Sequence, residues 1–259
     1  MPRYAVKLAY DGSRFHGSQA QPEPLRTVQS EMLGAMQKLG TNDPVLRFAG
    51  RTDAGVWARG NVVALETDFL REKLLQALTR NMEDVWAWAI VDVDGGFDPR
   101  LASQRRYRYH LRSDIDAATL QEAMAPFVGR HDFRGFCRLE PGKDPVRRVT
   151  AIDVRRSGAY LLVDVAGESF LWNQVRRMVE AGRRVASGEL PRDIIQATLD
   201  AGKPAELGTA RAEGLVLMDV EYRGVVFEPG DARLLERLRW RDQDLELERA
   251  KIADVLGPG

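Results

Sequence analysis

Hydrophobic and polar positions over residues 1–100 follow two periods that alternate along the chain. Apolar side chains at every second position predict strands at Arg3–Tyr10, Val45–Ala49, Asn61–Glu66 and Val85–Val93. Apolar side chains at helical spacing predict helices at Thr27–Leu39, with Thr27 as N-cap, and at Leu70–Asn81. The first hundred residues therefore have the order β-α-β-β-α-β.

The same order recurs over residues 101–225. Strands are predicted at Arg105–Leu111, Val146–Val154, Tyr160–Val165 and Leu215–Tyr222, the middle two forming a hairpin that turns at Ser157-Gly158. Helices are predicted at Asp116–Val128, near Phe170–Ala186 and near Asp193–Asp200. Each half fits the split β-α-β-β-α-β arrangement, ferredoxin-like, with four strands and two helices on one face. We expect an α+β protein whose two similar sheets leave a cleft between them.

Three segments follow from this pattern. Residues 1–100 form an N-terminal half, residues 101–225 a C-terminal half, and residues 226–259 a helical extension that begins after Glu228-Pro229-Gly230. The leucines of the extension form one apolar stripe, which is typical of packing against the parent domain or a partner subunit. We assign no chemistry to the extension.

Composition narrows the class of protein. The chain has 259 residues, of which 44% are hydrophobic and 29% charged, so it can bury a sizeable core and is neither fibrous nor disordered. Its one cysteine, Cys137, and three histidines give no disulfide framework and no zinc-ligand spacing. No apolar run approaches the roughly 20 residues that span a bilayer, and the N-terminal stretch lacks the apolar block of a signal peptide. We expect a cytoplasmic protein with neither a membrane nor a metal partner.

The net charge is zero, but the charges are unevenly distributed. Residues 100–184 carry 17 basic and 10 acidic side chains, whereas residues 1–99 carry 11 and 13. Most of the cationic side chains are arginine, whose planar fork suits phosphate and base recognition. Charge by itself leaves phosphate binding and a solvated surface equally plausible for this basic block.

A loop of small residues between two predicted strands has the most unusual composition in the chain. It reads Gly50-Arg51-Thr52-Asp53-Ala54-Gly55-Val56, and its glycines would let a flat ligand approach the single carboxylate. In an isolated loop, a turn in which Asp53 caps its own backbone would be the simpler interpretation.

Together with other motifs, this loop is similar to the signature of the tRNA pseudouridine synthase A family. The further motifs are Tyr10-Asp11-Gly12, Thr27-Val28-Gln29, Arg105 to Tyr109, Asp132-Phe133, Phe170 to Met178, and Ala212 to Leu215. They occur in the family's order over about residues 3–223, which is far more specific than any single motif. The resemblance implies a pseudouridine-synthase fold, two similar α/β halves around an RNA-binding cleft.

The resemblance also implies roles for individual residues. Asp53 corresponds to the family's catalytic aspartate, Tyr107 to the tyrosine that stacks on the target uracil, and Arg176 to the basic residue that pairs with the aspartate. Tyr107 and Tyr109 alternate with Arg106 and Arg108, so we expect rings on one strand face and cations on the other. Candidates for RNA contacts are Arg14, Gln19, Arg51, Thr52, Arg105, Arg106, Arg108 and Arg177.

The implied reaction isomerises uridine to pseudouridine at positions 38, 39 and 40 of the tRNA anticodon arm, without cofactor or metal, by a homodimer. Such an enzyme must extrude the target nucleotide from its stack, which costs a few kcal/mol. Two departures from the family, Trp57 in place of histidine and Ser18 in place of tryptophan, concern the choice of uridine. The alternative function is a non-catalytic RNA-binding module that uses the same basic cleft.

One motif favours a different chemistry. Val91-Asp92-Val93-Asp94-Gly95-Gly96 resembles the strand-end double aspartate of magnesium-dependent phosphohydrolases of the haloacid-dehalogenase type. That motif normally ends the first strand of a parallel domain, whereas here it follows two predicted helices. A strand-end turn at Asp94-Gly95 explains the segment adequately.

Overall fold

The structure is a computed structural model that describes residues 1–21 and 25–231. The chain divides into two compact units. Unit 1 comprises Met1–Ala102 together with the chain from Asp219 onward, and unit 2 comprises Ser103–Met218. The predicted C-terminal helix lies outside the described residues from position 232 onward.

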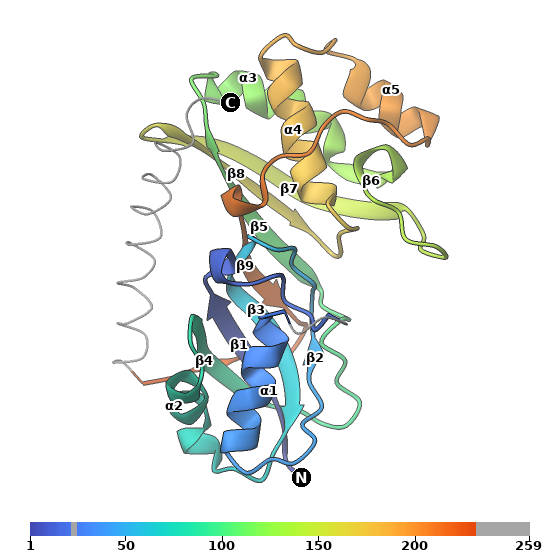
Figure 1. Cartoon of the computed structure of the whole chain (residues 1–259). Helices are drawn as coiled ribbons and strands as arrows, with labels where there is room; N and C mark the ends of the chain where they lie inside the picture. The colour runs from blue at the N-terminus through green and yellow to red at the C-terminus, as the bar shows by residue number, and fades with distance from the viewer. Residues whose placement is uncertain (22–24, 232–259) are drawn as a thin grey trace. The chain divides into compact units, whose positions relative to one another are not determined.

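Unit 1 is an antiparallel sheet with two helices (Figure 1). The sheet order is β10-β4-β1-β3, and β2 also pairs with β3. The strands are β1 (Arg3–Tyr10), β2 (Arg47–Phe48), β3 (Trp57–Glu66), β4 (Val85–Asp92) and β10 (Glu228–Pro229), and the helices are α1 (Val28–Lys38) and α2 (Arg71–Asn81). Both helices bury their apolar stripes, and they lie side by side (Figure 1).

Helix α1 begins where its sequence predicts. The Thr27 hydroxyl accepts from the backbone N–H of Ser30 at 3.1 Å, and the Ser30 hydroxyl accepts from the N–H of Thr27 at 2.9 Å. This reciprocal capping box satisfies two donors that a helix start otherwise leaves unpaired. The expected N-cap is confirmed, and the buried Met32 and Met36 lie one helical turn apart on the face that the periodicity predicts.

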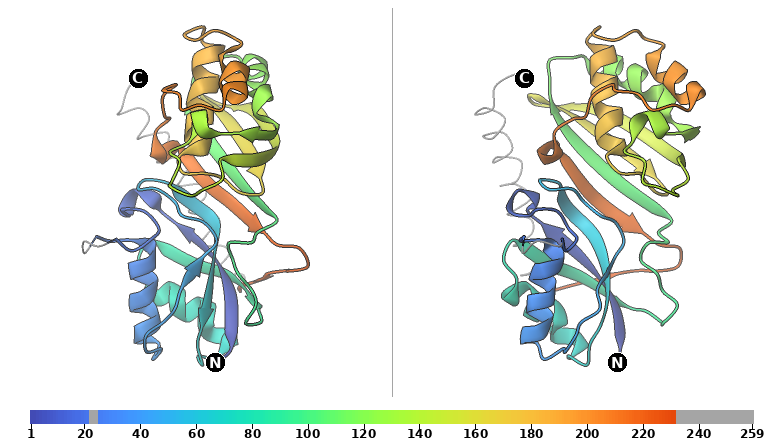
Figure 2. Two further views of the ribbon diagram at one scale, coloured as in Figure 1. Left: turned by 90° about the vertical axis from the view of Figure 1, so that its right-hand side faces the viewer. Right: turned by 45° about the vertical axis from the view of Figure 1, so that its right-hand side comes forward.

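In unit 2, antiparallel strands follow the order β5-β8-β7-β6, and three helices accompany them (Figure 2). Its strands are β5 (Gln104–Arg112), β6 (Gly129–Asp132), β7 (Val146–Ser157) and β8 (Tyr160–Gly167), and its helices are α3 (Ala117–Met124), α4 (Gln174–Ala186) and α5 (Ile194–Ala201). Strand β9 (Leu215–Glu221) begins in unit 2 and ends in unit 1. The α+β class predicted from the sequence is confirmed.

Two predicted elements have wrong bounds, and one strand was not predicted. The strand predicted at Val45–Ala49 is only two residues long, and β6 was not predicted because Gly-Arg-His-Asp has no apolar alternation. The helix predicted from Phe170 begins at Gln174, because Asn173 has a left-handed backbone with φ of 63°. No helix among the described residues is long and apolar enough to cross a membrane.

Candidate active site

The Asp53 loop, Gly50–Val56, is held by hydrogen bonds on both sides of its carboxylate residue. The backbone N–H of Thr52 donates to the Ser18 hydroxyl at 2.8 Å, and the N–H of Ser18 donates back to the Thr52 carbonyl at 3.1 Å. After the carboxylate, Val56 N–H donates to the Asp53 carbonyl at 3.1 Å and closes a turn. These bonds fix the backbone on either side of Asp53, whose side chain is half-buried.

A buried polar network supports the same loop from below. The Tyr10 hydroxyl lies 2.8 Å from Thr52 Oγ1, and it accepts from Asn61 Nδ2 at 3.1 Å. Asn61 Nδ2 also donates to the Gly50 carbonyl at 3.1 Å. Tyr10 is 2% exposed and Asn61 is fully buried, so water cannot replace these partners without cost. Through these two residues, strands β1 and β3 hold the Asp53 loop in position.

Two glycines let the backbone before α1 approach the Asp53 loop. A Cβ at Gly12 would lie 2.1 Å from the Val56 carbonyl oxygen, a separation that no side chain tolerates. Gly12 also accepts from the N–H of Gly55 at 3.2 Å, which ties the two segments together. Gly17 has φ of 97°, a left-handed conformation that favours glycine, and lies against the Thr52 carbonyl. Glycine is needed at these two positions because the two backbone segments lie so close together, and not because the chain must be flexible there.

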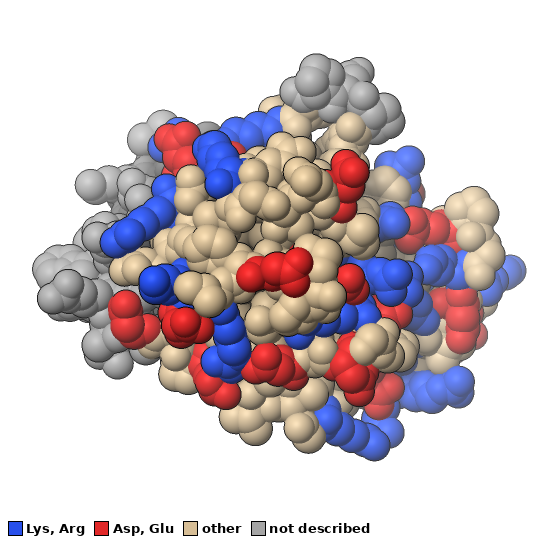
Figure 3. Space-filling model, turned by 90° about the horizontal axis from the view of Figure 1, so that it is seen from below, with Lys and Arg blue, Asp and Glu red and all other residues tan. Residues whose placement is uncertain are grey.

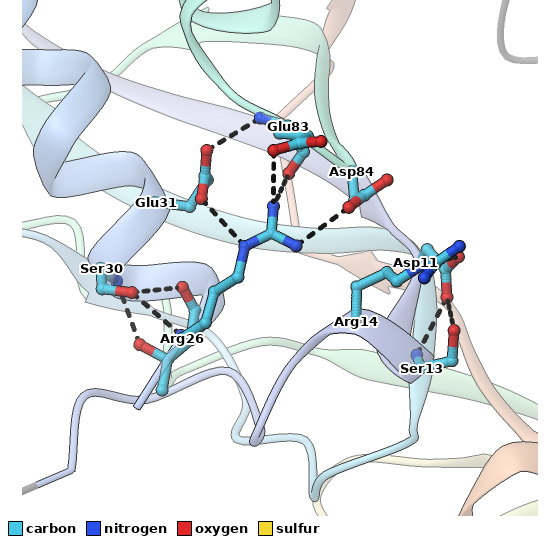
Figure 4. A network of polar contacts seen from close by, with 9 residues as sticks. Asp11, Ser13, Arg14, Arg26, Ser30, Glu31, Glu83 and Asp84 are labelled. Carbon is cyan, nitrogen blue, oxygen red and sulfur yellow. Dashed lines mark hydrogen bonds and ion pairs between the residues drawn. The ribbon is translucent and has the colours of Figure 1, made fainter. Parts of the chain in front are cut away.

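The far end of that segment is clamped by Arg26 (Figure 4). Its Nη1 lies 3.0 Å from the Asp84 carboxylate, its Nε lies 3.4 Å from Glu31, and its Nη2 donates to the Glu83 carbonyl at 2.9 Å. The guanidinium also lies over the Phe15 ring, 4.6 Å from its centroid. This clamp joins the segment to α1 and to the start of β4, so the residues that hold the Asp53 loop are themselves fixed.

Three of the predicted RNA-contacting side chains border this loop within unit 1. Arg14 ends the short 3-10 helix Gly12–Arg14, and its side chain is 64% exposed beside Asp11 (Figure 4). Gln19 and Arg51 are exposed as well. Thr52, in contrast, is buried, and its hydroxyl is engaged with Tyr10. In unit 1 the structure therefore offers Arg14, Gln19 and Arg51 to solvent and uses Thr52 to hold the loop.

In unit 2, strand β5 separates rings from cations as its alternation predicts. Tyr107 and Tyr109 are buried on one face, and Tyr107 contacts Phe170 edge to face with ring centroids 5.3 Å apart. Burial raises the pKa of Tyr109 to about 12, with Arg176 opposing the shift. The expected division of β5 into an aromatic and a cationic face is confirmed.

The arginines of β5 differ in what their guanidinium groups do. Arg106 is exposed, whereas Arg105 is buried and donates to the Glu168 carbonyl. Arg108 makes a bidentate pair with Asp164 on β8, at 2.7 and 2.9 Å. Such a fork is geometrically specific and already uses the planar donors that a phosphate would need.

Arg176 is held at the start of α4. Its Nε donates to the Ala210 carbonyl at 2.7 Å, and its Nη1 donates to Asn173 Oδ1 at 3.2 Å. Asn173 reaches that position through its left-handed backbone, a conformation that costs a non-glycine residue about 1–3 kcal/mol. Glu180, one turn further along α4, pairs with Arg183 at 2.9 Å. The strained backbone of Asn173 thus places its side-chain oxygen where it accepts from Arg176.

The double-aspartate segment forms the turn that explains it without metal chemistry. Asp94 Oδ1 accepts from Gly96 N–H at 2.8 Å, and Asp92 pairs with Arg71 at 2.6 Å. Strand β4 is antiparallel to both of its neighbours. Within residues 1–21 and 25–231, no group of His, Cys, Asp and Glu is arranged to hold a metal ion.

Several residues that organise the site were not predicted from the sequence. Tyr10 belongs to the Tyr10-Asp11-Gly12 motif, but the motif did not predict which residue its hydroxyl contacts. The structural roles of Ser18, Asn61 and Asn173 could not be predicted, because each depends on hydrogen bonds to residues distant from any periodic pattern. The predicted Asp53 belongs to unit 1, and the predicted Tyr107 and Arg176 belong to unit 2.

Comparison with known proteins finds a consistent set of relatives. A family model described as tRNA pseudouridine synthase matches residues 123–223. The tRNA pseudouridine synthase A of Thermococcus kodakarensis is 39% identical over 249 residues, covering 92% of this chain and 91% of the relative. That of Pyrococcus furiosus is 39% identical over 236 residues, with 90% and 88% covered. A Cbf5-Nop10-Gar1 crystal structure covers 70% of this chain and 54% of its own at 16% identity, with a TM-score of 0.36.

Proposed function

Because the chain belongs to the tRNA pseudouridine synthase A family, and is therefore a pseudouridine synthase, we propose that it isomerises uridine in the anticodon arm of tRNA, at positions 38, 39 and 40. The observation that carries this proposal is 39% identity to a tRNA pseudouridine synthase A over 92% of this chain, together with an Asp53 loop whose backbone is fixed on both sides. A rigid carboxylate is what a reaction at a glycosidic carbon needs, because the nucleophile must wait close to both sugar and base.

The reaction breaks the bond between N1 and C1′, turns the uracil, and joins C1′ to C5. The proton that leaves C5 passes to solvent, and N1 gains one, so atoms and charge balance. Asp53 is the nucleophile of the proposal, attacking either C1′ or C6 of the uracil. We propose that Tyr107 lies against the extruded base and that Arg176 favours the charged form of the carboxylate. Both roles come from the family resemblance.

Replacing the carboxylate tests the proposal. In the Asp53→Asn variant we expect release of tritium from C5-labelled uridine in a tRNA transcript to be abolished, with tRNA affinity within several-fold of the wild type. Asp43→Asn is the matched control, because Asp43 is exposed and its positive φ of 48° suits asparagine equally well. Retained turnover in the Asp53 variant would reject Asp53 as the nucleophile.

The position of modification needs a separate measurement. Carbodiimide-dependent reverse-transcription stops on several transcripts would map the modified uridines, and we expect stops within positions 38–40. Stops elsewhere would contradict the anticodon-arm assignment, and no stops at all would favour the non-catalytic RNA-binding alternative. The homodimer stays a prediction, tested by the mass of the protein in solution by light scattering.

A further inference from the structure

Three arginines on three different elements of unit 2 lie close enough to one buried thiol to influence its pKa. Arg134 lies in a short 3-10 helix after β6, Arg147 on β7 and Arg177 on α4. The three, together called the arginine cluster, act electrostatically on Cys137. Burial raises the pKa of that thiol, while Arg177, Arg147 and Arg134 each oppose the shift. Residues far apart in sequence thus place like charges around one point.

Backbone contacts fix the cluster in place. Arg134 Nη1 donates to the Gly202 carbonyl at 3.2 Å, and Arg177 Nη1 donates to the Ala205 carbonyl at 3.4 Å, so both hold the same loop. Arg147 Nη1 donates to the Asp144 and Val146 carbonyls, each at 2.7 Å. The guanidinium groups are therefore positioned before any ligand arrives, which lowers the entropy that binding costs.

The cluster is short of negative charge. Among the described residues, Asp132 is the one carboxylate paired with it, at 3.4 Å from Arg134. Three guanidinium groups that are always charged thus face one carboxylate. On the face seen in Figure 3, in contrast, acidic and basic side chains are interspersed. A like-charged group of this kind is costly unless an anion balances it.

The cluster also holds donors that lack an acceptor. The buried Nε atoms of Arg134, Arg147 and Arg177 have no hydrogen-bond partner in the described part of the chain. A buried donor left unsatisfied costs about 1–3 kcal/mol. These three are the buried side-chain polar atoms of the described chain that lack a partner, and all belong to the cluster. The Nε atoms are closed to solvent, whereas the three arginines as a whole are half-buried, so a ligand would meet their exposed atoms and not these donors.

Next to Cys137 in the sequence, an arginine stacks on an aromatic ring. Arg138, directly after Cys137, lies with its guanidinium 4.2 Å from the ring centroid of Trp172. The two segments are joined by a hydrogen bond from Arg138 N–H to the Trp172 carbonyl at 2.9 Å. Trp172 is 41% exposed. Exposed aromatic rings beside cations are typical of surfaces that contact RNA strands.

We propose that the arginine cluster is a phosphate-binding subsite of unit 2 that holds a backbone phosphodiester of the tRNA. The inference rests on the proposed function, which supplies the RNA. A phosphodiester offers acceptor oxygens and one negative charge, which match guanidinium groups that are held in place and carry an excess of positive charge. Arg134 and Arg147 are positioning residues for the RNA backbone, and they take no part in the bond changes.

The test measures tRNA affinity as a function of salt. Wild type, Arg134→Gln and Arg147→Gln are titrated with a fluorescently labelled tRNA transcript by anisotropy at several KCl concentrations. Loss of one phosphate contact lowers the slope of log K against log salt by about 0.9, which weakens binding about eightfold at 0.1 M salt. We expect that change in each glutamine variant. A Kd within twofold of wild type and an unchanged slope would overturn the proposal.

Two further variants separate charge from folding. Arg134→Lys and Arg147→Lys keep the positive charge and should recover the wild-type salt slope; the same slope loss in the lysine variants would refute a phosphate contact. Arg192→Gln removes an exposed arginine at the other end of α5 from Gly202 and should leave affinity and slope unchanged. An equal loss in Arg192→Gln would show a diffuse charge effect and refute a specific subsite.

Failure of the subsite and failure of the proposed function are distinguishable. If wild type releases tritium from tRNA and the Arg134 and Arg147 variants bind normally, only the subsite is rejected. If wild type releases no tritium but the variants still weaken tRNA binding with a reduced slope, the subsite stands and the catalytic proposal fails. Wild type that does not bind tRNA rejects both.

Discussion

The Tyr10 hydroxyl contacts both Thr52 of the Asp53 loop and Asn61 of the strand beneath it. Tyr10→Phe therefore tests how the loop is held in position. It removes the partner of Thr52 Oγ1 at 2.8 Å and the acceptor of Asn61 Nδ2 at 3.1 Å, and it leaves the ring in place. Both remaining partners are buried, at 8% and 0% exposure. We expect the variant to fold and to lose stability.

The expected magnitude follows from those contacts. Leaving a buried polar group unsatisfied costs about 1–3 kcal/mol, and the Asn61 amide keeps its other acceptor, the Gly50 carbonyl. The free energy of unfolding should therefore fall by about 2 kcal/mol. Because the loop loses its support, tritium release should fall as well, by up to about 100-fold for a displacement near 1 Å. Affinity for tRNA should change little.

Urea unfolding followed by tryptophan fluorescence measures the stability change, and a double-mutant cycle assigns it. Tyr10→Phe, Thr52→Val and the double variant should show a coupling of about 1 kcal/mol, the net worth of one hydrogen bond. A destabilisation below about 0.5 kcal/mol, the range of surface substitutions, together with zero coupling would refute the argument. The stability result holds whatever the enzyme's substrate proves to be.

Three further predictions follow from the described contacts. Gly12→Ala should destabilise the protein by about 1–3 kcal/mol and impair tritium release, because the new Cβ meets the Val56 carbonyl. The control is Gly34→Ala on α1, where nothing lies within 4 Å of the new Cβ, and it should stabilise the protein by about 0.5–1 kcal/mol. Equal unfolding midpoints for the two variants would contradict this prediction. Asn173→Gly should keep the backbone but release Arg176, so kcat should fall while the unfolding free energy changes less than in Asn173→Ala. Tyr109 has a folded pKa of about 12 against an ordinary value of 10, so its contribution to stability is complete below pH 10 and is lost as the pH rises through 12. In Tyr109→Phe, the unfolding free energy measured against pH should therefore fall less over this alkaline range.

Periodicity predicted most of the fold because each element's burial follows its own sequence. In β5 every second residue is buried, and in α1 the apolar stripe is the buried stripe. The hairpin between β7 and β8 also follows its turn signal, since Ser157 pairs with Tyr160 and Gly158 takes a positive φ. Local sequence is enough wherever one face of an element meets the core.

The failures occur where strand pairing or one residue's backbone conformation decides, and not the apolar pattern. Strand β6 has no apolar pattern and exists because His131 and its neighbours pair with β7. Helix α4 begins at Gln174 and not at Phe170, because Asn173 adopts a backbone that stops the helix from extending backwards. No periodicity carries that information, since one residue's dihedral angle decides it.

The Asp53 loop shows why a motif can be identified before its reason is known. Chemistry requires only the carboxylate, yet Gly12, Gly17 and Thr52 are each restricted by contact with the loop or within it. Ser18 makes the point sharply: it stands where the family commonly has tryptophan, and its hydroxyl receives the Thr52 N–H. A tryptophan side chain has no acceptor for that donor, so this arrangement of Ser18 and Thr52 depends on the hydroxyl. The position of the Asp53 backbone is therefore set in part by residues that lie outside the loop itself.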